Sequence, residues 1–388
     1  WTRDAKELEA KFTDDGYAPV IMYAQDDADE QASQVSDMTE EGVSAMVIAP
    51  VDPYGLSEEL KAAKEAEIPV IAYDDLIMNT DGVKYYVTFG GRQIGQLIGQ
   101  EIIDKEELDK LQEEKGSKTI EFLMGSLDDT QALFFYNGLM EKLQPYLDDG
   151  TLVCKSGQIT FEETGILRWS MDEAQSRAED ILEEAYQDGE APDIICTGFD
   201  GAAEGAVNAL QNNGLTPGEN WPMITGVGCD ADAVRDIAES EIACSVFMDR
   251  RVLADQAEDM VNVYLHGEDD PEVNDYEQYD NGTKIIASYL CEPQLINIDN
   301  YEILIDNGYY TEDEVKPETT PTPEPTVTPE ITEEPDVTAT PEVTESPEAT
   351  ITPEVTEESE ETATPTPTEK VTPTPKERVT LKRSTKNK

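Results

Sequence analysis

The chain has 388 residues, a length that allows two ordinary domains. Acidic residues outnumber basic ones 86 to 27, which gives a formal net charge of -59. Proteins that bind nucleic acids or anionic membranes neutralise phosphates with a basic face, so this composition argues against both as partners.

The final segment, residues 316–388, differs in composition from everything before it. It has no aromatic residue and no glycine, and it repeats Thr-Pro-Glu-Val-Thr with small variations. Such a segment buries too little apolar surface to offset an ordering entropy of about 1–2 kcal/mol per residue. We therefore expect a disordered Thr/Pro/Glu-rich tail after a folded part that ends near residue 315. A flexible acidic spacer and a stalk that crosses a cell wall are both open interpretations of this tail.

The first half of the folded part alternates helices with short apolar strands. Helices are predicted near residues 1–15, 30–42, 56–67 and 92–110, and strands at 19–24, 45–50, 69–74 and 84–89. Continuously apolar strands separated by helices indicate a parallel sheet that is covered on both faces. Such a lobe normally begins with a strand, whereas this chain begins with a helix, so we expect that a first strand is missing.

The same alternation restarts after a polar break at residues 113–118. Strands are predicted at 119–125, 152–155, 193–197, 222–228 and 243–248, and helices near 130–145, 170–187, 202–213 and 231–240. A helix near 251–265 and two short strands at 284–290 and 294–298 follow. The predicted fold class is therefore α/β, with two doubly wound parallel-sheet lobes.

Catalytic and metal-binding patterns are scarce. The single histidine, His266, follows an amphipathic run where a helix would end, which favours a surface position over a general base. The five cysteines show no CxxC spacing, so a zinc or iron–sulfur site is not expected. We expect the cysteines to be buried free thiols, with one disulfide as the alternative. No P-loop, GxSxG or HExxH occurs. We expect no catalytic residue, no metal and no cofactor.

Ligands of open α/β sheets bind outside the carboxyl ends of the strands. The residues at these positions are mostly carboxylates and amides, and a carboxylate suits a ligand with vicinal hydroxyl groups because it accepts two hydrogen bonds at once. Aromatic rings that could cover the apolar face of a sugar lie near the same strand ends at Tyr73, Trp169 and Phe199. Three more rings at residues 134–136 fit either this role or core packing on a helix.

Several segments in order resemble the bacterial periplasmic binding proteins for xylose and for multiple monosaccharides. They lie at residues 23–27, 34–38, 47–50, 70–74, 125–129, 155–158, 167–169, 199–201, 271–275 and 309–313. The resemblance covers the whole folded part. It implies an extracytoplasmic, monomeric receptor of the type I periplasmic binding protein fold, which closes on a sugar and presents it to an ABC transporter permease or a membrane sensor.

The resemblance also implies how the lobes are built from the chain. Three crossing segments would form the hinge, so each lobe would be discontinuous in sequence. The N-terminal lobe would comprise residues 1–114 and 251–283, and the C-terminal lobe residues 115–250 and 284–315. The late helix would return to the first lobe and the last strands would reach the second.

The candidate ligand-binding residues come partly from the strand ends and partly from this resemblance. They are Trp1, Asp27, Asp74, Asp75, Asp129, Gln131, Trp169, Asp200 and Asp230. The chain departs from the family at three places. An arginine of the family is replaced by Asp75, the family's Phe-Asp-Asn is replaced by Phe89-Gly90-Gly91, and a lysine of the family is replaced by Met248. The family also has a sugar-binding arginine directly before the position of Trp1. Each charged hydrogen bond contributes about 1.5–3 kcal/mol, so we expect a changed ligand or a weakened site.

Four classes of function are compatible with these observations to different degrees. A transport receptor ranks first and a sugar-sensing subunit that reports to a membrane receptor or kinase ranks second. A transcriptional regulator of the same fold would carry a basic helix-turn-helix, against which the acidity argues. An enzyme ranks last.

Overall fold

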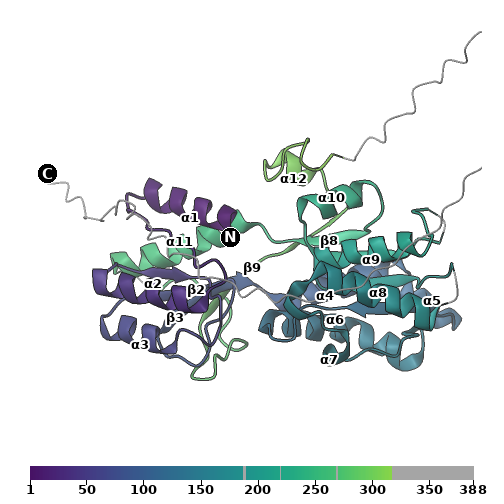
Figure 1. Cartoon of the computed structure of the whole chain (residues 1–388), viewed down its shortest axis with the longest axis horizontal. Helices are drawn as coiled ribbons and strands as arrows, with labels where there is room; N and C mark the ends of the chain where they lie inside the picture. Colours follow the sequence, from purple (N-terminus) through teal and green to yellow (C-terminus); the bar gives the residue numbers. More distant parts are fainter. Residues whose placement is uncertain (187–188, 219, 268–269, 317–388) are drawn as a thin grey trace, which may run out of the picture. The chain divides into compact units, whose positions relative to one another are not determined.

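The computed structural model describes residues 1–316 apart from 187–188, 219 and 268–269. The tail predicted at 316–388 thus lies outside the described residues from residue 317 onward. Two sheets form the core of the described part, one of four strands and one of six, with helices between successive strands (Figure 1).

The first sheet is entirely parallel, as the continuously apolar strands predict. Its helices include α2 (Ala28–Glu41), which ends at Gly42 in the left-handed conformation, and α3 (Ser57–Glu65). Its strands are β1 (Met46–Ile48), β2 (Val70–Tyr73), β3 (Val83–Phe89) and β9 (Ser288–Cys291), in the order β1-β2-β3-β9.

The strand predicted at residues 19–24 is not formed, and that prediction is wrong. An isolated extended segment becomes a strand only when a neighbour accepts and donates its backbone hydrogen bonds. β1 is an edge strand of the described sheet and pairs only with β2, so the apolar residues 19–24 have no ladder to join.

The second sheet has the order β10-β8-β7-β6-β4-β5, and only β10 runs antiparallel to its neighbour. Its strands are β4 (Lys118–Leu123), β5 (Leu152–Val153), β6 (Ile194–Thr197), β7 (Met223–Gly228), β8 (Cys244–Phe247) and β10 (Gln294–Asn297). Its helices are α6 (Thr130–Asp149), α7 (Phe161–Thr164), α8 (Met171–Ala185), α9 (Asp200–Asn212) and α10 (Ala231–Ala238), with a 3-10 turn at Leu167–Trp169.

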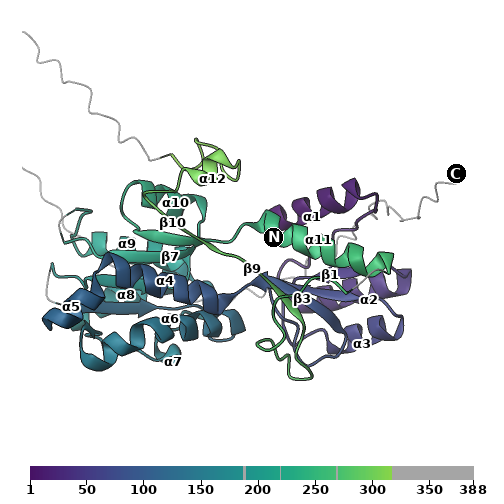
Figure 2. The same ribbon diagram turned by 180° about the vertical axis from the view of Figure 1, so that it is seen from behind.

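Helix α4 (Gly91–Lys105) packs closely against α6, and the two lie side by side in both views (Figures 1 and 2). Glycines make this approach feasible. A Cβ atom built on Gly95 would lie 2.0 Å from the carbonyl oxygen of Phe135, and one on Gly138 would lie 2.0 Å from that of Arg92. The predicted helix at 92–110 is in fact two, because Glu107 adopts a left-handed conformation before α5 (Leu108–Glu114).

The late helix, α11 (Arg250–His266), lies beside α1 (Thr2–Asp14) and contacts β2, β3 and β9 (Figure 1). Within the described residues the chain passes between the two sheets three times, after β3, after β8 and after β9. These contacts place α4 and α5 with the second sheet and β9 with the first, where we had expected residues 91–114 and 284–291 in the opposite lobes.

A short C-terminal segment around α12 (Ile303–Asp306) joins elements that are far apart in the sequence. The Arg3 guanidinium lies 4.2 Å from the ring centroid of Tyr309, and that of Arg251 lies 5.1 Å from it. The hydroxyl of Tyr310 donates a hydrogen bond to the carbonyl oxygen of Cys229, at 2.9 Å. This segment therefore ties α1 and α11 to the loop after β7.

His266 and the cysteines lie in the surroundings that the sequence predicts for them. His266 ends α11 and is exposed, with Nδ1 2.8 Å from the carbonyl oxygen of Asn262. All five cysteines lie in the described part with free thiols, and four are buried, so the alternative of a disulfide is not realised. Among the described residues, no group of three or more His, Cys, Asp or Glu side chains could hold a metal, and no helix is long and apolar enough to cross a membrane.

Candidate functional site

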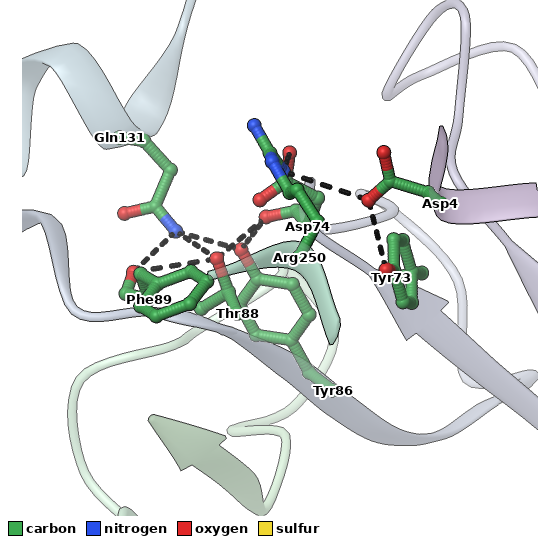
Figure 3. A network of polar contacts seen from close by, with 8 residues as sticks. All are labelled: Asp4, Tyr73, Asp74, Tyr86, Thr88, Phe89, Gln131 and Arg250. Carbon is green, nitrogen blue, oxygen red and sulfur yellow. Dashed lines mark hydrogen bonds and ion pairs between the residues drawn. The ribbon is translucent and has the colours of Figure 1, made fainter. Parts of the chain in front are cut away.

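The turn after β2 carries Asp74 in a strained backbone conformation. Its φ is +64°, a left-handed value that non-glycine residues adopt at a cost. The carbonyl oxygen of Asp74 compensates by accepting two hydrogen bonds from β3, from the hydroxyl of Tyr86 at 2.5 Å and from Thr88 Oγ1 at 2.8 Å (Figure 3). The turn therefore presents its carboxylate from a fixed backbone.

Arg250, the first residue of α11, binds this carboxylate. Its Nη1 lies 2.8 Å from Asp74 Oδ2 and 3.9 Å from Asp4 Oδ1, and Asp4 accepts a hydrogen bond of 2.9 Å from the hydroxyl of Tyr73 (Figure 3). The charge of Asp74 raises the pKa of Arg250 further above its usual range. Sequence reasoning missed this arginine. It follows β8 within three residues, so the rule that searches strand ends would have found it there.

Asp129 and Gln131 reach the same place from α6. Asp129 caps the helix, and its Oδ1 accepts a hydrogen bond of 2.7 Å from the backbone nitrogen of Gln131. Gln131 Nε2 donates to the hydroxyls of Tyr86 and Thr88, at 2.8 and 2.9 Å (Figure 3). Because both hydroxyls give their only hydrogen to the carbonyl of Asp74, they can only accept from Gln131, which fixes the orientation of its amide.

The carboxylates of this group repel one another. Burial and the charges of Asp74 and Asp129 raise the pKa of Asp75 well above its usual range. Burial and then the charge of Asp74 raise the pKa of Asp129, although a backbone hydrogen bond from Gln131 opposes the shift. The site is thus rich in acceptors, and among the described ion pairs Arg250 is the cation that compensates it.

Asp200 and Asp230 form a second pair at the ends of β6 and β7. Asp200 is buried, and its carboxylate accepts hydrogen bonds of 2.7 Å from the hydroxyl of Ser245 and from the backbone nitrogen of Asp230. Burial raises the pKa of Asp200 to about 7. The side chain of Asp230 itself is exposed at the start of α10. The structure therefore makes Asp200 a support for the loop and leaves Asp230 open to a ligand.

Trp169 lies in the 3-10 turn that precedes α8, among the elements around the second sheet, and its indole is partly exposed. Its ring lies edge-on to Phe199, with centroids 5.4 Å apart and planes at 87°, and 37% of its surface is exposed. Gly125 makes room for it, since a Cβ there would lie 2.3 Å from the indole. The rings at residues 134–136 have other contacts. Phe135 is buried, Tyr136 donates a hydrogen bond to the carbonyl oxygen of Ile159, and Phe134 is half-buried against Tyr279, with ring centroids 5.3 Å apart.

The remaining two candidates lie at helix starts. Trp1 precedes α1 and is 57% exposed, and the carboxylate of Asp27 caps α2 by accepting from the backbone nitrogens of Asp29 and Glu30. No hydrogen bond or ion pair among the described residues connects either side chain to Asp74 or Arg250. Their grouping with the other candidates stays a prediction.

A surface groove lies apart from these residues. A cavity of about 550 Å³ is lined by residues of α4 and α6 and by Gln278, and it includes none of the candidate ligand-binding residues. We regard the strand ends as the better site, because polar groups with shifted pKa values converge there. Carboxylate acceptors, one guanidinium and an exposed indole suit a small molecule with several hydroxyl groups.

Known proteins resemble this chain over most of its length. Residues 1–269 match the family model described as periplasmic binding protein domain. The multiple sugar-binding periplasmic receptor ChvE of Rhizobium radiobacter is 38% identical over 81% of this chain and 88% of its own length. The D-xylose-binding periplasmic protein of Escherichia coli is 27% identical over 81% and 88%. A solved ABC transporter solute-binding protein of Clostridium phytofermentans with bound β-D-glucose is 39% identical, with a TM-score of 0.75 over 81% of this chain and 96% of that one.

Proposed function

Because the chain belongs to the periplasmic binding protein family, we propose that it is a solute-binding protein that captures a monosaccharide and delivers it to an ABC transporter. The observation that carries this proposal is the similarity, over 81% of the chain, to a solute-binding protein solved with β-D-glucose. The sugar is of the xylose, glucose or galactose kind.

The strand ends described above would supply the binding groups. Asp74, Asp75, Asp129 and Asp230 would accept hydrogen bonds from sugar hydroxyls, and the indole of Trp169 would pack on the apolar face of the ring. Asp200 would act mainly by holding the backbone of Asp230, since both of its carboxylate oxygens are already bonded within the protein. Gln131 is held through its Nε2 by the hydroxyls of Tyr86 and Thr88, while its buried Oε1 has no partner among the described residues and would accept from a sugar hydroxyl. Trp1 and Asp27 complete the proposed set.

The proposal includes where and with whom the protein works. Its relatives are periplasmic, and we propose a bacterial extracytoplasmic protein that lies in the periplasm or is associated with the cell surface or cell wall. We further propose that it acts as a monomer, binds no nucleic acid and is not an enzyme. Its protein partner would be the permease of the ABC transporter.

A second function deserves a test because one relative is named a receptor. In this alternative the sugar-bound protein passes its state to a membrane receptor or kinase. The two functions share the same ligand step and differ in the membrane partner. Crosslinking of the sugar-bound protein in its native membrane, followed by identification of the bound chain, separates a permease from a kinase.

The ligand step is tested by isothermal titration calorimetry of the full chain with D-glucose, D-xylose, D-galactose and L-arabinose. We expect saturable binding of some of these sugars with a selective profile, because Asp75 and Met248 change the polar groups of the site. Equal micromolar binding of all four would contradict the changed specificity. Binding of none, and of no other pentose or hexose, would contradict the proposed function.

A further inference from the structure

Arg250 occupies a special position in the chain. It opens α11 directly after the segment in which the chain passes from β8 of the second sheet back to the first. Its guanidinium reaches the turn after β2, where it pairs with Asp74 and lies near Asp4. A residue of the crossing segment therefore contributes its charge to the candidate site.

Most of the hydrogen-bonding capacity of this guanidinium is unused. An arginine carries five N–H donors in a rigid plane. Within the described part of the chain, only Nη1 of Arg250 has hydrogen-bond or ion-pair partners, and Nε and Nη2 do not belong to the buried polar atoms that lack one. These two nitrogens therefore contact solvent. The side chain of Arg250 keeps 27% of its surface exposed and that of Asp74 keeps 21%.

The guanidinium is nevertheless held in place. Asp74 fixes one edge of it through a carboxylate whose backbone is bonded to Tyr86 and Thr88, and Asp4 is fixed by the hydroxyl of Tyr73 (Figure 3). Donors that are oriented before the ligand arrives cost little conformational entropy on binding. Hydrogen bonds from a charged donor to a neutral acceptor are also stronger than those between neutral groups.

We propose that Arg250 is a ligand-contacting residue, and that its free Nε and Nη2 donors bind oxygen atoms of the sugar. The inference rests on the proposed function and names one more determinant of its specificity. Arg250 would supply charged donors to a site in which the other charged groups of the cluster are carboxylates. The competing explanation is that Arg250 has a purely structural role, in which its ion pair with Asp74 attaches α11 to the turn after β2.

Substitution of Arg250 with a matched neighbour as control distinguishes the two. We expect Arg250→Ala to weaken binding of the best sugar found for the unaltered chain by about 10- to 100-fold, the range for a charged hydrogen bond. Arg250→Lys keeps the charge but loses the planar fork, so an intermediate loss is expected. The control is Arg251→Ala, whose guanidinium binds Asp249 and the carbonyl oxygen of Asn307 instead, and we expect it to change affinity by less than about twofold.

A second readout excludes a merely structural effect. The same variants are titrated with a series of monodeoxy derivatives of that sugar. If Arg250 contacts the ligand, the derivative that lacks the bound oxygen loses affinity in the unaltered chain but loses little more in Arg250→Ala. A purely structural role would instead lower affinity for all derivatives by the same factor, and that result would overturn the inference.

The failure of this inference differs from the failure of the proposed function. If the unaltered chain binds a sugar and Arg250→Ala binds it within about twofold, only the role of Arg250 is overturned. If the unaltered chain binds no pentose or hexose, the proposed function is overturned and this inference with it.

Discussion

The carboxylate of Asp200 holds the backbone of Asp230, with Oδ2 2.7 Å from the Asp230 nitrogen, while Oδ1 accepts from Ser245 at the same distance. Gly226 and Gly228 cover it closely, since Cβ atoms there would lie 2.4 and 3.0 Å from its oxygens. A carboxyl group enclosed in this way is desolvated, which disfavours its charged form.

The first prediction concerns the pH dependence of stability. Burial raises the pKa of Asp200 to about 7, against about 3.9 in an unfolded chain. The folded state therefore binds the extra proton between these values, so the stabilisation is complete below pH 4 and is lost as the pH rises through 7. Asp200→Asn cannot lose this proton. The free energy of unfolding of the unaltered chain, relative to this variant, should fall by about 3 kcal/mol from pH 4.5 to pH 8 in urea titrations. A constant difference would contradict the assignment.

The second prediction concerns Asp75. Burial and two neighbouring carboxylates raise its pKa well above the usual range, so its ionisation destabilises the folded state as the pH rises above the unfolded value. Asp75→Asn removes this penalty. We expect the variant to have a higher melting temperature than the unaltered chain at pH 7.5, with the gap shrinking toward pH 4. The control is Asp81→Asn, because Asp81 is an exposed partner of Lys64 and its pKa is lowered by that residue.

The third prediction tests the contact of α4 with α6. In Gly95→Ala, the added methyl group would meet the carbonyl of Phe135 at 2.0 Å, so the helices must separate. We expect a loss of about 1–3 kcal/mol in the free energy of unfolding, although alanine favours helix more than glycine does. Gly90→Ala is the matched control. Its φ is -72° and its nearest neighbour would lie at an ordinary 3.5 Å, so it should remain within about 0.5 kcal/mol.

The fourth prediction uses the tryptophans as reporters. The indole of Trp169 is partly exposed beside Phe199, whereas Trp221 donates its indole N–H to the carbonyl of Glu241. Sugar binding should desolvate Trp169 and shift the emission spectrum to shorter wavelength. We expect Trp169→Phe to reduce this shift to whatever the exposed Trp1 of the proposed set contributes, and Trp221→Phe to retain it. A shift that survives Trp169→Phe and disappears with Trp221→Phe would place the ligand elsewhere.

The sequence allowed prediction of those features that depend on local pattern. Alternation of apolar strands with helices was enough for the two sheets and most helix positions, because burial on both faces imposes a continuous apolar run on each strand. The four positions Asp74, Asp75, Asp129 and Gln131 were found from strand ends and from a family resemblance. The structure brings them together through contacts with β3 and through their shared electrostatics.

Other features depended on partners that no local pattern identifies. The apolar run at 19–24 reads as a strand, but a strand needs a neighbour. Helix α4 follows β3 directly and could cover either sheet, and its choice of α6 depends on glycines 43 residues apart, at 95 and 138. Arg250 stands at a strand end that the sequence could have pointed to, but its pairing with Asp74, 176 residues away, is visible only in the folded chain. The site thereby regains a cation where Asp75 and Met248 suggested a loss.

The stacking of Arg3 and Arg251 on Tyr309 has a mechanical consequence. Tyr309 and Tyr310 lie between the last strand, β10, and the end of the described chain at Lys316. A load applied to the chain beyond Lys316 would reach these two rings before any strand of either sheet. The buried side chain of Val315, the hydrogen bond from Arg235 to the carbonyl oxygen of Glu314, aromatic stacking and one tyrosine hydrogen bond, rather than a β-ladder, would then decide how the load enters the folded part.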